Sequence, residues 1–318
     1  METIYKFKNP ENENKLISLD GHFTMMIEKN FQTEILIKMG EVKVNEFKSE
    51  HKPLVKLFET LEILFGHNVK ITSRDLVNII YAVKKGVAEA LIDLYLNKQV
   101  ILTTKDGKQI FPRTLTQNEY LKAMKKESLV FAVGPAGTGK TFLAVMYAVS
   151  LLKEGRIDKI ILTRPVVEAG ERLGFLPGDV KEKIDPYLIP LYDALRESLG
   201  EQTFRKMIEI GKIEIAPLAY MRGRTLDDSL IILDEAQNAT RTQMKMFLTR
   251  LGFNSKMIVT GDISQVDLPS YKDSGLVDAI DILKDIKGLK IINFSHYDVM
   301  RHPLVNEIIK KYEGKLNK

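Results

Sequence analysis

The segment SLVFAVGPAGTGKTFLAV, residues 128–145, decides the fold class of the second half of the chain. It opens with a continuous apolar run, as in strands buried on both faces, and closes with an apolar helical pattern. Between them, GPAGTGKT at 134–141 satisfies the pattern G-x-x-x-x-G-K-[ST] in the strand, turn and helix context that it requires. A turn that is merely rich in glycine would rarely match the whole pattern in this context. We therefore predict a phosphate-binding loop.

The residues of this loop suit a nucleoside triphosphate. Glycines let backbone N–H groups curl around an anion, and the N-terminus of the following helix adds partial positive charge. Lys140 can reach the β- and γ-phosphates, and the hydroxyl of Thr141 can ligate Mg²⁺. The predicted nucleotide-binding set is Gly134, Pro135, Ala136, Gly137, Thr138, Gly139, Lys140 and Thr141.

From residue 117 onward, short apolar strands alternate with helical patterns. Their hydrophobicity is continuous rather than alternating, which indicates a parallel sheet between two helix layers. We therefore predict an α/β fold with a P-loop NTPase core. The expected strands are SLVFAV, KIILT, IEIAPL, LIILDE, KMIVTGD and LKIINF.

One of these strands ends in two acids. LIILDEAQN at 230–238 places Asp234 and Glu235 at a carboxyl strand end, where α/β sheets bind ligands. An apolar run ending in two acids is ordinary by itself. Together with a P-loop, it favours Asp234 as a Mg²⁺ ligand and Glu235 as the group that orients and deprotonates an attacking water.

Another strand ends in VTGDISQVD at 259–267. If this strand lies between the other two, Gln265 faces the γ-phosphate and could sense its hydrolysis. The alternative is a plain strand-end turn in which Asp262 caps the next helix.

Several arginines are candidates for contact with a nucleic acid. Guanidinium groups neutralise backbone phosphates, although mixed-sign charges usually mark a solvated loop or helix face. Nucleotide contact and RNA contact both stay open for the pair in AYMRGRT. The candidates are Arg164 in LTRP, Arg172 in the mixed-charge segment that follows, and Arg222 and Arg224 in AYMRGRT.

The remainder of the chain shows a second domain without evident chemistry. Residues 1–98 predict a small α+β domain, in which Ser73 is a plausible N-cap of an amphipathic helix. Residues 99–116 predict a β-hairpin connector around Asp106 and Gly107, and 117–318 form the ATPase-like domain.

Composition bounds the remaining possibilities. The chain has 318 residues, a net charge of +5 and no cysteine, which excludes a disulfide scaffold and fits a reducing cytoplasm. The charge is compatible with nucleic-acid binding without requiring it. The five histidines show no metal-ligand spacing, and neither a signal peptide nor a membrane span is expected, so we predict a cytoplasmic protein.

Taken together, seven strings resemble the PhoH-like protein family over about Pro112 to His302. They are GPAGTGKT, LTRPVVEAGERLGFLPGD, KIDPYLIPLYDAL, APLAYMRGRTL, IILDEAQN, QMKMFLTRLGFNSKMIVTGDISQVDLP and DVMRHPLV. The resemblance implies an ATPase with a RecA-like core similar to superfamily 1 helicases, using ATP and Mg²⁺.

The resemblance also implies roles for single residues. Lys140 and Thr141 fill the Walker A roles, Asp234 and Glu235 the Walker B pair, and Gln265 the phosphate-sensing position. Gln117 lies where such proteins read adenine, Arg164 where they contact the nucleic-acid backbone, and Arg301 resembles the arginine that completes the γ-phosphate site.

Superfamily 1 helicases close two RecA-like domains on one ATP, whereas 117–318 suffices for one. We therefore expect a homo-oligomer, a ring-like hexamer with ATP at subunit interfaces and Arg301 as the leading candidate to act in trans. The N-terminal part resembles a region likened to KH domains, but FGHN at 65–68 is not the GxxG loop that clamps RNA. That domain could bind RNA or contact a neighbouring subunit.

Two functions compete at this stage. The first is a Mg²⁺-dependent ATP hydrolase coupled to binding or remodelling of single-stranded RNA, in ribosomal RNA processing. The resemblance to the family also implies a YbeY-type endoribonuclease as partner. The second is a nucleotide-gated scaffold that regulates a partner protein without unwinding RNA. Glu235 and Gln265 disfavour a small-molecule kinase, which needs an acceptor site instead.

Overall fold

The chain divides into two compact units in a computed structural model. Unit 1 contains Met1–Gln99 and Pro112–Leu115, and unit 2 contains Val100–Phe111 and Thr116–Val299. The structure describes residues 1–17, 22–46, 48, 51–165, 180–299, 305, 308 and 311, with the backbone alone at 22 and 180–187.

Unit 2 is built on a six-stranded sheet with the order β11-β6-β10-β9-β7-β8. Every neighbouring pair is parallel, which confirms the predicted α/β class and P-loop NTPase architecture. The strand β10 pairs with β6 on one side and β9 on the other, as the prediction for Gln265 requires. The strands are β6 (Leu129–Val133), β7 (Lys159–Arg164), β8 (Ile213–Pro217), β9 (Ser229–Leu233), β10 (Lys256–Gly261) and β11 (Leu289–Asn293).

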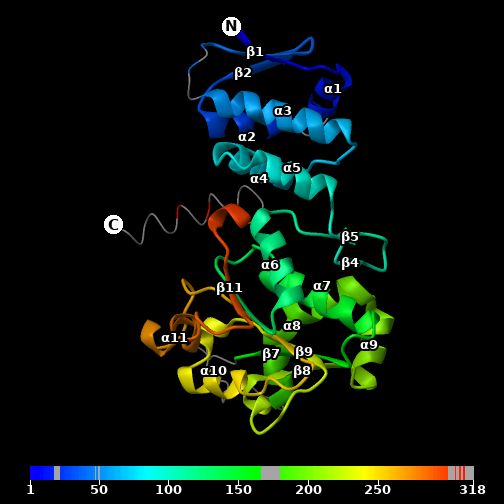
Figure 1. Cartoon of the computed structure of the whole chain (residues 1–318), viewed down its shortest axis with the longest axis vertical. Coiled ribbons are helices and arrows are strands. Elements are labelled where there is room, and N and C mark those ends of the chain that lie inside the picture. The colour runs from blue at the N-terminus through cyan, green and yellow to red at the C-terminus, as the bar shows by residue number, and fades with distance from the viewer. Residues whose placement is uncertain are drawn as a thin grey trace. The chain divides into compact units, whose positions relative to one another are not determined.

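Helices cover both faces of this sheet (Figure 1). Alternate strand residues enter two different cores: Ile160 and Leu230 pack beneath α7, while Ile161 and Ile231 face α10 and α11. Strands buried in this way explain why their hydrophobicity is continuous in the sequence. The helices are α6 (Leu115–Lys126), α7 (Lys140–Lys153), α8 (Val180–Leu199), α9 (Glu201–Glu209), α10 (Arg241–Leu248) and α11 (Gly275–Ile282).

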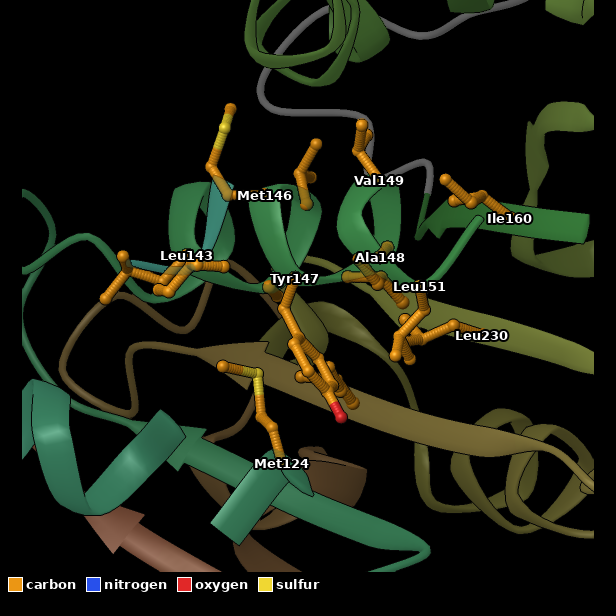
Figure 2. Close-up of a cluster of buried hydrophobic side chains, with 14 of the residues drawn as sticks. Met124, Leu143, Met146, Tyr147, Ala148, Val149, Leu151, Ile160 and Leu230 are labelled. Atoms are coloured by element: carbon orange, nitrogen blue, oxygen red, sulfur yellow. The ribbon is translucent and has the colours of Figure 1, made fainter. Parts of the chain in front are cut away.

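The helix α7, which follows the P-loop, is anchored over most of its length. Figure 2 shows the side chains of Leu143, Tyr147 and Leu151 among those of neighbouring elements, including Met124 of α6. Each of these side chains is at most 3% exposed. Burial on this scale holds the N-terminus of α7, and so the loop before it, at one place above the sheet.

The predicted connector is an antiparallel hairpin of β4 (Leu102–Thr103) and β5 (Gln109–Ile110). Gly107 has a φ of 77° in its turn, a conformation that glycine adopts without the cost of a side chain. The backbone of the hairpin belongs to unit 2, and Lys108 pairs with Glu197 of α8 at 2.6 Å.

Unit 1 combines a three-stranded antiparallel sheet, order β1-β3-β2, with five helices among its described residues. Apolar side chains of all three strands and all five helices form one core. The elements are β1 (Glu2–Lys6), α1 (Glu11–Ile17), α2 (His22–Phe31), β2 (Ile35–Lys38), β3 (Glu41–Val44), α3 (Lys52–Gly66), α4 (Ser73–Lys84) and α5 (Ala88–Leu96). In the described parts of both units, no helix combines the length and the apolar character needed to cross a membrane.

The N-cap of α4 is Thr72, and the prediction of Ser73 was wrong by one residue. Thr72 accepts from the backbone of Asp75, and the Asp75 carboxylate accepts in return from the backbone N–H of Thr72. This reciprocal pair satisfies two N–H groups that the helix start would otherwise leave open, so the acid three positions on decides the cap.

The same Asp75 carboxylate is the polar centre of unit 1. It is fully buried, and its Oδ1 accepts from the Tyr95 hydroxyl and from Arg113, each at 2.7 Å. Burial raises the pKa of Tyr95, which keeps its hydroxyl protonated as a donor. Residues far apart in the sequence are therefore joined through one side chain.

We predict that Asp75→Ala destabilises unit 1 by about 3 kcal/mol or more, because it leaves the Arg113 charge and the Tyr95 hydroxyl without their buried acceptor. Hydrogen exchange in urea, followed by mass spectrometry of peptides from each unit, measures this loss. Asp93→Ala on the exposed side of α5 is the control and should change stability by less than about 0.5 kcal/mol. An equal effect of both changes would contradict the role of Asp75.

Candidate functional site

The loops that follow β6, β9 and β10 meet at one edge of the sheet. These strands are neighbours and run parallel, with Gly261 beside Val133 and Val259 beside Leu233. Ligands of α/β sheets bind at this carboxyl edge. The P-loop, the pair Asp234 and Glu235, and the segment from Gly261 to Gln265 therefore face a common space.

The backbone of the P-loop depends on its glycines. Gly137 and Gly139 have φ values of 85° and 82°, in the left-handed region that other residues rarely adopt. Gly134 has a φ of 143°, and a Cβ there would lie 2.2 Å from the carbonyl oxygen of Phe294. Glycine is thus required at these positions for two reasons. The backbone adopts positive φ values, and at Gly134 it also lies very close to Phe294, the residue after β11.

Lys140 lies inside the loop. The residue is only 7% exposed. Its Nζ donates to the carbonyl oxygens of Gly134 at 2.6 Å and Pro135 at 2.8 Å. A buried ammonium requires such partners, because desolvation without them is costly. The positive charge is therefore centred among the residues predicted to surround a phosphate.

Two buried side chains of α6 support the loop. Gln117 is 3% exposed, and its Nε2 donates to the carbonyl of Thr138 at 3.0 Å. The Tyr120 hydroxyl donates to the carbonyl of Lys140 at 3.3 Å, and burial together with the negative charge of Asp234 raises the pKa of Tyr120. The structure thus places Gln117 against the P-loop backbone, and its contact with adenine stays a prediction.

Asp234 joins the P-loop to β10. Its Oδ1 accepts from the Thr141 hydroxyl at 2.6 Å and from the Thr260 hydroxyl at 2.7 Å. A hydroxyl next to a carboxylate is an oxygen set of the kind that Mg²⁺ prefers, with waters and phosphates completing its six positions. The residues present therefore fit the Mg²⁺ ion that the sequence predicts.

Glu235 follows Asp234 in an uncommon conformation. Its φ is 51° and its ψ 39°, a left-handed backbone that costs free energy for a residue with a side chain. One carboxylate oxygen lies 3.5 Å from Nη2 of Arg164, and the other accepts from Nε2 of Gln237 at 2.5 Å. Arg164, predicted as a nucleic-acid contact, is thus placed beside the predicted hydrolytic base.

Asp262 links the segment after β10 to the P-loop. Its Oδ2 accepts from the backbone N–H of Ala136 at 3.2 Å and from Nε2 of Gln265 at 2.7 Å. Its Oδ1 accepts from both the backbone and the hydroxyl of Ser264. The strand-end turn of the alternative prediction is present, but Asp262 does not cap a helix, because the next helices begin after Ser270 and Ser274. Its carboxylate reaches the P-loop instead.

A cavity of about 490 Å³ lies among these groups. Four residues of α8 complete its wall, among them the acids Asp193 and Glu197. Its described lining is Ala136, Gly137, Gly139, Lys140, Thr141, Phe142, Arg164, Pro190, Asp193, Ala194, Glu197, Asp234, Glu235, Gly261, Asp262 and Gln265. A cavity of about 540 Å³ between α10 and α11 is slightly larger but mainly apolar, and its described lining includes no P-loop residue. The convergence of charged groups therefore identifies the first cavity as the candidate site.

Arg222 and Arg224 are not among the residues that line this cavity. Arg222 is exposed, whereas Arg224 forms a two-pronged ion pair with Glu214, with distances of 2.5 and 2.9 Å. The hydrogen bond from Arg224 is the largest cause of the lowered pKa of Glu214, so both groups stay charged. Arg172 and Arg301 lie outside the described residues.

Sequence reasoning missed Gln237 and Asn238. Both lie in the short helix η4 (Ala236–Asn238) and bind the segment after β10, Gln237 at Asp262 and Asn238 at Asp267. Two carboxamides shortly after Asp234 and Glu235 were visible in the sequence. Their partners were not, because only the pairing of β9 with β10 brings them together.

Comparisons with known proteins found relatives of this chain. A family model described as "PhoH-like protein" matches residues 109–313. A PhoH-like protein of Bacillus subtilis (strain 168) is 50% identical over 97% of this chain and 96% of its own length. One of Synechocystis sp. is 49% identical over 84% of this chain and 81% of its own. Among solved structures, the Hef helicase domain of Pyrococcus furiosus covers 57% of this chain and 38% of its own, with 17% identity and a TM-score of 0.35.

We predict that Gly134→Ala destabilises unit 2 by about 3 kcal/mol, because the added Cβ meets the Phe294 carbonyl at an already unfavourable φ. Gly155→Ala is the matched control: its φ is +66° and nothing lies within 4 Å of the new Cβ, so we expect a loss of about 1 kcal/mol. Thermal unfolding of the variants measures both. Equal losses would show that conformation alone, without the close approach, accounts for the glycine.

Proposed function

The chain belongs to the PhoH-like protein family and has a P-loop ATPase fold, and from this premise we propose that it is a Mg²⁺-dependent ATP hydrolase coupled to RNA. One observation carries the hydrolase proposal. Glu235 lines the same cavity as Lys140, Thr141 and Asp234. A second carboxylate beside a predicted metal ligand suits the activation of water, whereas transfer to an organic acceptor needs an acceptor site.

The binding roles follow from the chemistry of each group. The N–H groups of the P-loop and the N-terminus of α7 would hold the phosphates, with Lys140 as the countercharge. Thr141 and Asp234 would hold Mg²⁺, which when bound neutralises charge that develops on the phosphates. The hydroxyl oxygen of Thr141 and Oδ1 of Asp234 lie 2.6 Å apart, which supports this assignment.

The chain's own groups also supply the water chemistry in this proposal. Glu235 orients the attacking water and removes its proton, while Gln265, which donates to the Asp262 carboxylate and lines the same cavity, would face the γ-phosphate. Arg164 holds one oxygen of Glu235. Movement of Arg164 toward an RNA phosphate would then be felt by the base, which offers a route between the two ligands.

RNA is the proposed polymer partner. The net charge of +5 and the exposed Arg222 support it. We propose that single-stranded RNA is bound or remodelled with the energy of ATP, in ribosomal RNA processing with a YbeY-type endoribonuclease as partner. Arg172 remains part of this proposal as a predicted contact.

A homo-oligomer completes the proposal. The described residues contain one P-loop domain, and a γ-phosphate site of this kind is commonly completed by an arginine from elsewhere. We propose a hexameric ring in the cytoplasm, with Arg301 reaching the ATP of a neighbouring subunit.

We predict that Lys140→Ala lowers kcat for ATP hydrolysis by at least about 100-fold, because it removes the countercharge of the phosphates. Poly(U) should stimulate the wild-type protein more than duplex RNA does, and it should not rescue the variant. Lys153→Ala, at the exposed end of the same helix, is the control with wild-type rates. Phosphate release measures all arms; an identical rate with and without every RNA would refute coupling and leave hydrolysis standing.

We predict that native mass spectrometry with Mg²⁺ and a non-hydrolysable ATP analogue finds the mass of a hexamer, since the arginine that completes each site comes from a neighbour. Hydrolysis should then rise more steeply than protein concentration in dilute solution. A monomer with full activity per chain would rule out the ring.

A further inference from the structure

Gln237 is a buried carboxamide with polar partners on both sides of the candidate site. Its residue is 1% exposed. Nε2 donates to Oε2 of Glu235 at 2.5 Å and to the carbonyl of Gln265 at 3.3 Å, and Oε1 accepts from the backbone N–H of Asp262 at 3.0 Å. Both N–H groups and the oxygen of one side chain are therefore used.

These contacts continue to the P-loop. Asp262, whose N–H is held by Gln237, receives the side chain of Gln265 and the N–H of Ala136 on a single carboxylate oxygen. Glu235 and Ala136, which lie on different strand ends, are thus connected through two side chains. Networks of this kind transmit a displacement because each member has its geometry set by its neighbours.

The backbone of β10 packs closely against Gln237. A Cβ at Gly261 would lie 2.8 Å from Oε1 of Gln237 and 3.2 Å from its backbone nitrogen. Close packing leaves the carboxamide little room to change its rotamer. The orientation of the Gln237 carboxamide toward Glu235 is therefore restrained by packing against Gly261 as well as by hydrogen bonds.

Gln237 does not belong to the described lining of the cavity. We infer that it is a positioning residue, which fixes the Glu235 carboxylate against the segment 262–265 so that the hydrolytic base and Gln265 are oriented together. The inference rests on the proposed ATP hydrolase. It deepens that proposal, because it states what holds a base whose own backbone is strained.

Two variants test the inference. Gln237→Met has a similar length and removes every polar contact, while Gln237→Glu keeps the acceptor for the Asp262 N–H and loses the donor to Glu235. Both variants should lower kcat for ATP hydrolysis by about 30-fold or more, because misplacement of a catalytic group slows the reacting step. KM and the affinity for a fluorescent ADP analogue should change by less than about threefold.

Asn238→Ala is the matched control. Asn238 lies in the same turn and binds the same segment, donating to Asp267 at 3.3 Å and accepting from its N–H at 2.8 Å. Among the contacts of the described chain, its side chain has no hydrogen bond to the Glu235 carboxylate. Its backbone N–H donates to the Glu235 carbonyl at 3.0 Å, a bond that Asn238→Ala keeps. We expect its kcat to stay within about threefold of wild type, because a loosened segment alone leaves the base in place.

A double variant adds a readout that general destabilisation would not produce. If Gln237 and Gln265 act through one network, Gln237→Met together with Gln265→Ala should lose less kcat than the product of the two single losses. Thermal unfolding of each variant accompanies the rates. If Gln237→Met does not fold, the comparison of Gln237→Glu with Asn238→Ala decides.

The outcomes separate the two proposals. A wild-type protein that does not hydrolyse ATP refutes the proposed function. A wild-type protein that does, with Gln237 variants that keep kcat or lose no more than Asn238→Ala, overturns the inference and leaves the function intact. Fully multiplicative losses in the double variant also contradict the shared network.

Discussion

Parallel pairing of β10 with β6 and β9 is the constraint on which the candidate site depends. It places the carboxyl ends of three strands at one edge, so that the loops after them face each other. The contacts of Asp234 with Thr141 and Thr260 follow from this pairing. Asp234 comes directly after β9, Thr260 lies in β10, and Thr141 lies in the first turn of α7, which follows β6. Two apolar cores, one on each face of the sheet, keep that pairing buried.

The P-loop is organised by groups of the chain itself. Lys140 is held by two carbonyls, Thr138 is held by Gln117, and the Ala136 N–H is held by Asp262. A loop whose shape is already set loses less conformational entropy when it binds a ligand. Phosphate oxygens would also have to compete with these internal partners, so the same contacts that order the loop set a threshold for occupying it.

The strained Glu235 shows how a predicted catalytic group is supported. Its backbone is left-handed, and its two carboxylate oxygens are held by Arg164 and Gln237. Arg164 comes from the end of β7 and Gln237 from the turn after β9, which pair as neighbouring strands. The orientation of the Glu235 carboxylate therefore depends on several elements of unit 2. A ligand that moved Arg164 or Gln237 would change that orientation.

The α/β class, the P-loop and the acids after β9 could be predicted from the sequence, because each follows from local periodicity or from a motif whose residues are contiguous. For Gln265 the prediction was only conditional, requiring that the strand before it lie between the other two, and the structure meets that condition. No sequence pattern predicted that Arg164 contacts Glu235, that Arg224 is paired with Glu214, or that Gln237 joins two strand ends. These partners are far apart along the chain. Strand order and side-chain packing bring them together, and neither leaves a repeating pattern in the sequence.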